Sequence, residues 1–464
     1  MQTIFRPRWR AGAFLLGTLA LAGCANLSHD TGFCDVAQWV QQRAGGQTRW
    51  TRNEEDGGAI RKEVERMLSQ PLSADSAVTV ALMNNQGLQA AYDELGIAEA
   101  DVVQAGRLPN PRLSYLRASH DGAYKIETTF TFNILALFTI PMATEIEKRR
   151  FEQVKRRAAL QAIDVASDTR RAFYAAVAAR QMASYAEQVR ESAEAGSELA
   201  RRMAAAGNFS RLQQSREQAF LSEAIVQVDR TRQDAIGRSE ALTRLLGLES
   251  PSKLKLPERL PDLPKAVDDL RDAEQQALDG RLDIAAARLD LEGLAKSLDL
   301  TRTTRFVNAI EFGPAWATET PEPRKKGFEL SLEVPLFDWG GARVARAEAV
   351  YLQGVHRLAA LANEARSEVR ERYSAYKTAF GTARHYRDDI VPLRKAISDE
   401  MLLRYNGMLS SVFELLADAR EQAASVSAAI EAQRDFWIAE TELRAALAGA
   451  SMTKPGESTA RVNH

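Results

Sequence analysis

The sequence predicts a mainly helical protein that also contains two pairs of β-strands. Three observations support this fold class. The stretch Phe328–Val334 alternates apolar and polar residues, which is typical of a strand with two different faces. A helical pattern follows with little interruption from Ala342 to Asn406. The same junction occurs a second time, where the alternating stretch Lys125–Ile134 precedes a helical pattern rich in Glu, Lys and Arg.

The first 23 residues are predicted to be a cleaved export signal. Three arginines precede an apolar run from Ala11 to Leu21, which is too short to cross a bilayer. The following Leu21-Ala22-Gly23-Cys24 resembles the lipobox of bacterial lipoproteins. The resemblance implies that Cys24 becomes the acylated, palmitate-bearing first residue; an ordinary signal with an incidental cysteine is the alternative. Ala25 in place of Asp favours sorting to the outer membrane.

The composition of the chain disfavours nucleic-acid binding and transmembrane helices. The chain has 464 residues and a net charge of −1, so it lacks the basic footprint of a nucleic-acid-binding protein. If Cys24 carries lipid, Cys34 is the second of two cysteines and no disulfide within the chain is possible; we expect an incidental thiol there. Beyond residue 24 no apolar stretch reaches about 18 residues, so any membrane crossing must use strands.

The predicted organisation has a lipid-anchored segment, two copies of one unit and a linker between them. Residues 24–71 form the N-terminal segment, which is polar and contains a helix near Ile60–Leu68. The first copy covers 72–250 and the second 270–449. The linker 251–269 contains four prolines and is expected to be extended. Residues 450–464 are expected to be a disordered tail.

Each copy is predicted to contain a helix, a strand hairpin, a long helix and a shorter helix. The first copy has helices at about 75–102, 143–203 and 210–246 and strands within about 112–138. The second copy has helices at about 270–300, 342–405 and 411–448 and strands within about 306–334. The helix 143–203 would be ~90 Å long at 1.5 Å per residue, which is far beyond a globular helix.

The two copies can be aligned residue by residue. Leu88 aligns with Ile284, Leu95 with Leu291, and Ala206-Gly207 with Asn406-Gly407. Arg216-Glu217-Gln218-Ala219 matches Arg420-Glu421-Gln422-Ala423 about one helical turn out of step. Units of this length are too long for a solenoid array, so the pattern indicates an internal duplication.

The strand number restricts how the chain could cross a membrane. Each copy supplies two strands, and four strands cannot close a barrel. The edges of an open four-stranded sheet would lack hydrogen-bond partners in hydrocarbon. The strands either form a small soluble sheet or are pooled by several chains. Two chains would supply eight strands and three would supply twelve, and only the larger barrel leaves a clear water channel.

Three motifs resemble those of the TolC-like outer-membrane efflux proteins. They are LPNPRLSY at Leu108–Tyr115, VPLFDWGGAR at Val334–Arg343 and RYNGMLSSVFELLADAR at Arg404–Arg420. The resemblance covers about residues 72–449, including the duplication. It implies a homotrimer whose twelve-stranded β-barrel crosses the outer membrane and continues into a periplasmic α-helical barrel. It also implies docking to a periplasmic adaptor and an inner-membrane pump, which together expel drugs, metal ions or other toxic solutes.

The resemblance assigns the two turns between the long and short helices to a closable periplasmic tip that contacts the adaptor. Tyr405 and Glu414 match positions that link neighbouring helices in the shut state; the alternative is that they only cap or pack a helix turn. Ser410 stands where the family commonly has an arginine, and Arg211 or Arg404 could substitute for it. The tip candidates are Gly207, Asn208, Ser210, Arg211, Tyr405, Gly407, Ser410 and Glu414.

An enzyme is disfavoured by the residue pattern. No pair among the five histidines has metal-ligand spacing; they are His29, His120, His356, His385 and His464. The sequence also lacks a phosphate-binding glycine loop and a nucleophile elbow. We therefore expect no catalytic residue, no metal site and no cofactor beyond the lipid on Cys24.

A lipid-anchored periplasmic coiled-coil scaffold or tether without channel activity is the alternative function. The helices favour it in part, because their faces carry many alanines and few large residues. A scaffold would not need two strand pairs in matching positions, so a channel accounts for more of the sequence. No His-rich or Met-rich tract argues for metal ions, and the family resemblance assigns choice of cargo to the pump.

Overall fold

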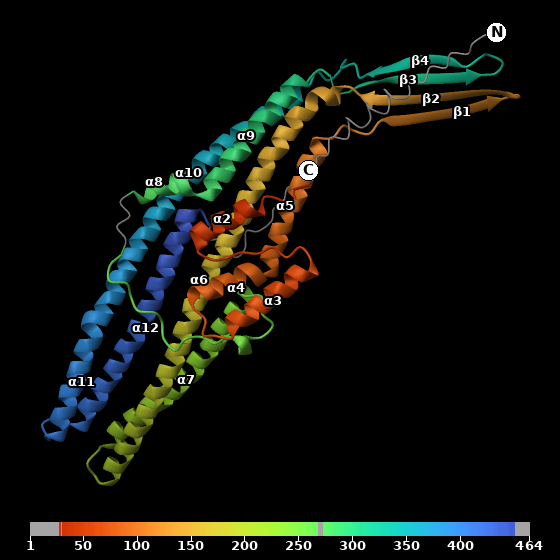
Figure 1. The fold of residues 1–464 in the computed structure, drawn as a ribbon. Helices are drawn as coiled ribbons and strands as arrows, with labels where there is room; N and C mark the ends of the chain where they lie inside the picture. Colours follow the sequence, from red (N-terminus) through yellow and green to blue (C-terminus); the bar gives the residue numbers. More distant parts are fainter. Residues whose placement is uncertain (1–26, 29, 268–271, 308, 451–464) are drawn as a thin grey trace. The chain divides into compact units, whose positions relative to one another are not determined.

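The chain contains one series of helices and strands that occurs twice (Figure 1). The computed structural model describes residues 27–28, 30–267, 272–307 and 309–450, so the predicted signal, Cys24 and the tail from 451 lie outside the described residues. The first series is α4 (Ala74–Asn84), α5 (Gln86–Ala105), β1 (Arg112–His120), β2 (Ala123–Asn133), α6 (Leu135–Ala205) and α7 (Arg211–Leu245). The second series is α8 (Ala273–Gly280), α9 (Leu282–Thr303), β3 (Ile310–Glu319), β4 (Lys325–Leu332), α10 (Gly341–His385), the π-helical turn η2 (Tyr386–Ile390), α11 (Val391–Asn406) and α12 (Val412–Ala448).

The described chain divides into two compact units, and each contains segments of both copies. The first unit comprises Leu95–Glu152, Leu289–Val355 and the described part of residues 1–32. The second comprises Phe33–Glu94, Gln153–Arg288 and the described part of residues 356–464. The duplication is therefore a repeat of sequence and element order, in which neither copy folds as a separate body.

A four-stranded antiparallel sheet forms the first unit's β-structure, in the order β1-β2-β3-β4. The two hairpins join through β2 and β3, where Phe132 lies opposite Phe312 and Thr128 opposite Trp316. Strands from both copies thus form one sheet. The prediction of two strand pairs in matching positions is confirmed.

The first hairpin ends earlier than predicted. The strand expected to reach Phe138 ends at Asn133, and α6 begins at Leu135 with Pro141 inside its early turns. The last sheet contact is the Ile134 N–H, which donates to the Ile310 carbonyl at 2.8 Å, and the Asn133 side chain then accepts the Ala136 N–H at 3.1 Å. That side-chain bond satisfies a free amide at the start of α6, so the helix begins before the proline.

The first helix of each copy is broken, where the sequence predicted one continuous helix. The break lies at Asn85 in the first copy and at Arg281 in the second, and both have extended ψ angles, 115° and 127°. The N–H of each break residue still bonds the preceding helix, at Ala81 O and Ala277 O. The two breaks occur at the same position of the repeat.

The long helix predicted over 342–405 is interrupted by the π-helical turn η2. Val391 N–H bonds Tyr386 O, five residues back, and Pro392 follows directly. Proline lacks an N–H, so the regular ladder cannot continue through residue 392, and the wider turn carries the chain past it. Among the described helices, none is both long enough and apolar enough to cross a membrane.

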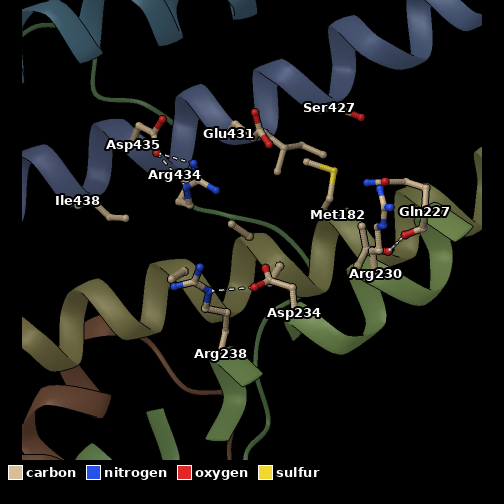
Figure 2. A pocket seen from close by; sticks show the side chains of 15 residues that line it. Met182, Gln227, Arg230, Asp234, Arg238, Ser427, Glu431, Arg434, Asp435 and Ile438 are labelled. Carbon is tan, nitrogen blue, oxygen red and sulfur yellow. Dashed lines mark hydrogen bonds and ion pairs between the residues drawn. The ribbon is translucent and has the colours of Figure 1, made fainter. Parts of the chain in front are cut away.

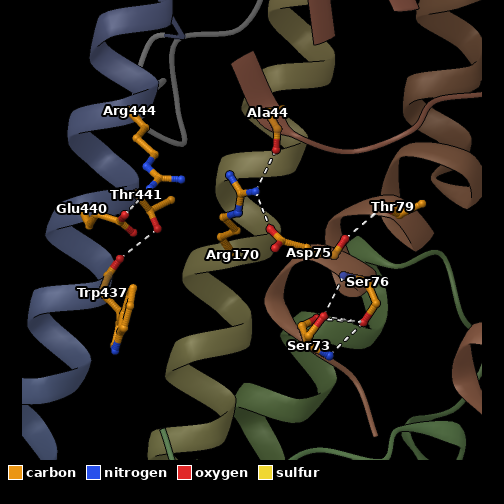
Figure 3. Close-up of polar contacts among 10 residues, drawn as sticks. All are labelled: Ala44, Ser73, Asp75, Ser76, Thr79, Arg170, Trp437, Glu440, Thr441 and Arg444. Carbon is orange, nitrogen blue, oxygen red and sulfur yellow. Dashed lines mark hydrogen bonds and ion pairs between the residues drawn. The ribbon is translucent and has the colours of Figure 1, made fainter. Parts of the chain in front are cut away.

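The N-terminal segment contains two helices, α2 (Phe33–Ala44) and α3 (Glu54–Leu68), where one was predicted. Arg170 of α6 fastens this segment, because its Nη2 donates to Ala44 O and to Asp75 Oδ1, both at 2.8 Å (Figure 3). Figure 3 also shows the Ser73–Ser76 capping box at the start of α4. From Phe33 onward the segment is thus part of the second unit.

The core of the second unit draws side chains from α3, α4, α6 and α7 and from the linker after α7. Among its buried members are Leu68, Val80, Phe173, Leu242 and Leu256. The linker begins with a short 3₁₀ turn, η1 (Pro251–Lys253), and then continues to residue 267 without helix or strand. It is held between helices of both copies: Arg180 of α6 donates to Leu256 O at 2.8 Å, and Trp437 of α12 to Pro261 O at 3.0 Å.

Candidate functional site

The four-stranded sheet has one apolar face and one mainly polar face. Residues directly opposite each other in an antiparallel pair point to the same side, so the register assigns the faces. Phe130 lies opposite Leu113, and Phe312 lies opposite Leu330. The apolar face carries Leu113, Tyr115, Ile126, Phe130, Phe132, Phe312, Trp316, Phe328, Leu330 and Leu332. Phe328 is 72% exposed, so within the described chain this apolar face is not covered.

The other face of the sheet is mainly polar. Its charged and hydroxyl side chains are Arg112, Ser114, Lys125, Glu127, Thr129, Thr131, Glu311, Glu319, Lys325, Glu329 and Ser331. Arg112 and Glu311 pair at 3.3 Å, and Lys125 and Glu127 at 2.7 Å. Charges of both signs on one side and aromatic and aliphatic groups on the other give the sheet the two-faced character of strands between lipid and water.

Gly313 holds the join between the two hairpins. A Cβ built on Gly313 would lie 1.8 Å from the carbonyl oxygen of Phe130, inside any permitted contact distance. The next residue, Pro314, has no N–H to give to the ladder. The close backbone approach at Gly313 keeps β2 and β3 together past this proline.

The outer edges of the sheet belong to β1 and β4, each of which pairs with one neighbour in the described chain. The edge strands β1 and β4 are 9 and 8 residues long, and the inner strands β2 and β3 are 11 and 10 residues long. Strands of this length suit a bilayer, and an edge in lipid requires another strand beside it.

The first tip joins α6 to α7 through Gly207 and Asn208. Gly207 has φ +80°, which glycine tolerates readily, and Asn208 N–H reaches back to Met203 O at 2.9 Å. Ser210 begins α7 with a capping box: it accepts the Gln213 N–H at 3.2 Å, and Gln213 Oε1 accepts the Ser210 N–H at 2.9 Å. Arg211 is the first helical residue after this cap and is exposed.

The second tip joins α11 to α12 and is capped by Glu414. Gly407 ends α11, and Met408 has φ +60°. Glu414 Oε2 accepts the Ser410 hydroxyl at 2.6 Å and the Ser411 N–H at 2.9 Å. These hydrogen bonds, that of the Ser410 hydroxyl first, lower the pKa of the Glu414 carboxyl. The Glu414 carboxylate is therefore hydrogen-bonded to residues of its own turn.

The polar tip candidates of the second turn bond residues of their own turn or helix. Glu414 bonds Ser410 and Ser411, while Arg404 pairs with Glu400 in its own helix at 2.9 Å. Tyr405 contributes its carbonyl oxygen to the turn, accepting the Met408 N–H at 3.0 Å. Within the described residues the side chains of Arg404 and Tyr405 do not bond Glu414, so a link to a neighbouring helix stays a prediction. Met408, 93% exposed, makes this tip apolar.

A polar groove of about 570 Å³ lies between α7 and α12 over α6 (Figure 2). Ala175, Ala178 and Ala179 of α6 contribute only methyl groups to its lining. Figure 2 shows charged side chains of α7 and α12 on its walls, among them Asp234 paired with Arg238 at 3.2 Å and Arg434 paired with Asp435 at 2.7 Å. Because these alanine side chains are small, they leave the groove open above α6.

An ion pair between the copies was missed by the sequence analysis. Glu217 of α7 and Arg420 of α12 are bonded, and the Glu217 side chain is 2% exposed. The repeat alignment contained both residues, within the matched stretches of Arg216 and Arg420. It compared them as equivalents, and nothing in their spacing indicated that the arginine of one copy bonds the glutamate of the other.

The residues described by the structure contain no group of three or more His, Cys, Asp and Glu side chains that could hold a metal ion. Cys34 lies exposed in α2. The features on which a function can be built are therefore the two-faced sheet and the two tips.

Known proteins share this fold. No profile of a protein family matches the chain. The cobalt-zinc-cadmium resistance protein CzcC of Cupriavidus metallidurans is 23% identical over 348 residues, which cover 73% of each chain. Among solved structures, the outer-membrane channel OprN matches with a TM-score of 0.68 and 18% identity, over 83% of this chain and 92% of OprN. The open state of the MtrE outer membrane channel of Neisseria gonorrhoeae matches with a TM-score of 0.66 and 18% identity, over 83% and 89%.

Both solved structures are outer-membrane channels. The likeness covers 83% of this chain in both comparisons. The chain therefore has the fold of the TolC-like outer-membrane efflux channels, as its sequence motifs predicted.

Proposed function

We propose that this protein is the outer-membrane exit channel of a tripartite efflux system. The observation that carries the proposal is the sheet, which has one uncovered apolar face, one polar face and two edges without a neighbour in the described chain. Such a sheet satisfies its backbone in a bilayer only by joining further strands at both edges. The apolar face then meets lipid and the polar face lines the passage.

Three copies account best for this closure. One chain has four strands, so a trimer supplies twelve, which is enough for a water-filled barrel, whereas the eight strands of a dimer would be filled by side chains. The long helices supply the periplasmic part of the conduit. The tips at Gly207–Arg211 and Tyr405–Glu414 close it and contact a periplasmic adaptor, which links the channel to an inner-membrane pump.

The same proposal includes the N-terminal anchor and the domain boundaries. After cleavage of residues 1–23, lipid on Cys24 holds the segment 24–71 at the outer membrane. Two efflux repeats, 72–250 and 270–449, follow on either side of the linker 251–269. Mass spectrometry of the mature N-terminus tests the anchor: a tri-acylated Cys24 that is lost in Cys24→Ser supports it, and an unmodified N-terminus contradicts it.

The cargo is toxic solute handed over by the pump. CzcC is a cobalt-zinc-cadmium resistance protein, so divalent metal cations are the first cargo to assay. Deleting the gene in its own host and measuring growth on cobalt, zinc and cadmium salts beside a panel of drugs separates the two classes. Sensitivity to metals alone would assign a metal system, and sensitivity to drugs alone would assign a drug system.

The deciding experiment is reconstitution of the detergent-extracted mature protein in planar bilayers. We expect a heat-labile trimer that gives discrete conductance steps. A Gly313→Val variant is the matched control, because it disrupts the sheet without touching the tips. A monomer without conductance would contradict the channel and favour the alternative, a lipid-anchored periplasmic scaffold or tether.

A further inference from the structure

The apolar face of the sheet carries two positive charges that no acidic side chain balances. The register places Arg117 of β1 opposite Ile126 and Lys326 of β4 opposite Trp316, so both cations lie on the apolar face. In the part of the chain that the structure describes, neither Arg117 nor Lys326 forms an ion pair. The four strands also contain acidic residues, and all of these lie on the polar face: Glu127, Glu311, Glu319 and Glu329.

The cations of the polar face, in contrast, have acidic partners. Arg112 pairs with Glu311 at 3.3 Å. Lys325 directly precedes Lys326 and pairs with Glu322 of the turn between β3 and β4. Consecutive residues of a strand point to opposite faces, so Lys325 and Lys326 meet different surroundings. The charge of the sheet is therefore balanced on one face and positive on the other.

A third cation lies over the apolar face. The Arg324 guanidinium, in the turn between β3 and β4, lies 5.9 Å from the centroid of the Trp316 ring. Lys326 is the strand partner of Trp316, so two cations adjoin one aromatic ring. Tyr124 stands on the same face beside the other turn and is 42% exposed. Trp and Tyr are enriched where membrane and water meet, because their rings have an apolar body and a polar group.

The three cations gather at one end of the apolar face. Both hairpin turns lie at the end of the sheet that is remote from the helices (Figure 1). Arg117 lies in the second half of β1, toward its turn, and Lys326 is the second residue of β4 after the other turn. The helix end of the same face carries exposed Phe312, Leu330 and Leu332. The face is thus apolar toward the helices and cationic toward the turns.

A lipid that has phosphate groups beside its acyl chains fits this arrangement. An unpaired cation is costly inside hydrocarbon and is tolerated at the membrane surface. Guanidinium groups bind phosphate oxygens through paired hydrogen bonds, and a lysine ammonium binds them as a point charge. In the proposed channel the turns face the exterior, where the leaflet of an outer membrane consists of lipopolysaccharide. The lipid A part of that glycolipid carries phosphates next to its acyl chains.

Closure of the barrel joins the cations of two copies. Arg117 belongs to β1 and Lys326 to β4, which are the two edges of the sheet. Within one chain β2 and β3 separate these strands. In a closed ring of copies β4 of one chain pairs with β1 of the next, and neighbouring strands lie about 4.8 Å apart. Arg117 of one chain then lies on the strand that adjoins Lys326 and Arg324 of its neighbour.

We propose that Arg117 of one copy and Arg324 and Lys326 of the next form a binding site for the phosphate groups of lipopolysaccharide. The inference rests on the proposed channel function and adds a lipid ligand at each seam between copies. The phosphates neutralise cations that no group on this face balances, while the acyl chains lie along the apolar residues nearer the helices. Because the lipid contacts two copies, it holds the trimer together.

The test compares lipids on the mature trimer, delipidated in neutral detergent, by native mass spectrometry. We expect one molecule of diphosphorylated lipid A to bind per seam and to raise the temperature at which the trimer dissociates. Lipid A from which the phosphates have been removed should bind at least about tenfold more weakly. Equal binding of phosphatidylglycerol, or displacement of lipid A by inorganic phosphate, would overturn the assignment to lipopolysaccharide.

Two matched variants test the residues. Arg117→Gln with Lys326→Gln should raise the Kd for diphosphorylated lipid A by about tenfold or more. Lys125→Gln with Lys325→Gln removes the same charge from the polar face of the sheet and should leave the Kd unchanged. Equal weakening in both variants would show general attraction of an anion and would contradict the site.

Failure of the lipid site and failure of the channel give different results. A conducting wild-type trimer whose affinity for lipid A does not depend on the phosphates would overturn the site alone. Absence of both trimer and conductance in wild type would overturn the channel function on which the site rests. If the Arg117→Gln, Lys326→Gln variant does not assemble, the comparison of the two lipid A forms on wild type still decides.

Discussion

Asn85 and Arg281 occupy the same position in the two copies and make the same kind of contact. Asn85 Nδ2 donates to Leu245 O at the end of α7, and Arg281 Nη1 donates to Ala446 O at the end of α12, each at 3.0 Å. Each residue breaks the first helix of its copy and binds the last helix of the same copy. The duplication is therefore preserved in tertiary contacts although the two side chains differ completely.

The glycines that follow α7 and α12 complete this junction, and Gly247 provides a test of it. Gly247 has φ +65°, and a Cβ on it would lie 2.5 Å from Asn84 O. Gly247→Ala should lower the free energy of unfolding by about 1–3 kcal/mol, measured by urea unfolding of the detergent-solubilised protein. Gly237→Ala, in the middle of α7 with open space around it, is the control and should stabilise the protein by up to about 1 kcal/mol. Equal effects of the two changes would show that the junction is not tight.

Arg281 should be among the most sensitive charged residues of the second unit. Its side chain is 2% exposed and bonds Asp283 and Glu368, both at 2.8 Å. Arg281→Met leaves these carboxylates without their common partner, so we expect a loss of about 3–5 kcal/mol in the free energy of unfolding. Arg302→Met removes the exposed pair with Glu348 and should cost at most about 1 kcal/mol. Similar losses would contradict the role assigned to burial.

The carboxyl group of Asp164 should make the free energy of unfolding depend on pH. The pKa of this carboxyl is raised to about 7, first by burial and then by the nearby charge of Asp168. The pKa of this acid is 3.8 in the unfolded chain and about 7 in the fold, so its contribution to stability is fully present below about pH 4, falls as the unfolded state ionises, and is lost once the pH has passed 7. We therefore expect Asp164→Asn to match wild type in unfolding free energy near pH 4, to gain on it as the pH rises from 4 to 7, and to exceed it by about 2–4 kcal/mol at pH 8.

The control for Asp164 is Asp290→Asn, which changes an exposed carboxylate of α9. Its difference from wild type should be the same at both pH values. An Asp164→Asn difference that also stays constant with pH would contradict protonation of Asp164 in the folded protein.

Gly313 should be essential to the sheet. Gly313→Val puts a side chain where the Phe130 carbonyl already lies, so β2 and β3 must separate at that point. We expect loss of the heat-labile oligomer on gels and a lower strand content by circular dichroism. Gly327→Ala, on β4 with open space around it, should assemble normally. Assembly of Gly313→Val at the wild-type level would contradict the close approach.

Substitutions in the second tip should change how often the channel is open. Tyr405→Phe combined with Glu414→Ala should raise the open population of the channel, because it removes the polar groups at the family's linking positions. Glu414→Ala also removes a helix cap and should cost about 1 kcal/mol of stability. Unchanged single-channel conductance and open time in a bilayer would contradict the prediction. Ser210→Ala removes the cap of the other tip and controls for that loss.

The sequence predicted the parts of the fold that depend on local patterns. Alternating stretches indicated β2 and β4, and the absence of breakers indicated the long helices. It failed where the cause lies far away in the chain. At the break the Asn85 side chain accepts the Leu88 N–H at 3.0 Å as a local cap, but its amide also bonds Leu245 O, 160 residues later, which the sequence did not indicate. The start of α6 before Pro141 depends on the end of β2, where the Ile134 N–H bonds Ile310 O in the second copy.

In the candidate site, too, the features set by local sequence were predicted and those set by distant contacts were not. The tip turns were located correctly because glycine and serine mark a helix end and the next cap, as Gly207 and Ser210 do. The pairing of Glu217 with Arg420 could not be predicted, since it depends on which face of α12 meets α7. Periodicity gives the faces of a helix but does not give their partners.

The two capping boxes differ in charge, and this difference bears on stoichiometry. The first tip is capped by neutral Gln213 and the second by acidic Glu414. In a threefold assembly of the proposed kind, six tips would alternate between neutral and acidic. A docking protein that requires the carboxylate would bind as three copies per channel, whereas one that reads only the shared backbone turn would bind as six. Counting adaptors on wild-type and Gln213→Glu channels would distinguish these two modes of assembly.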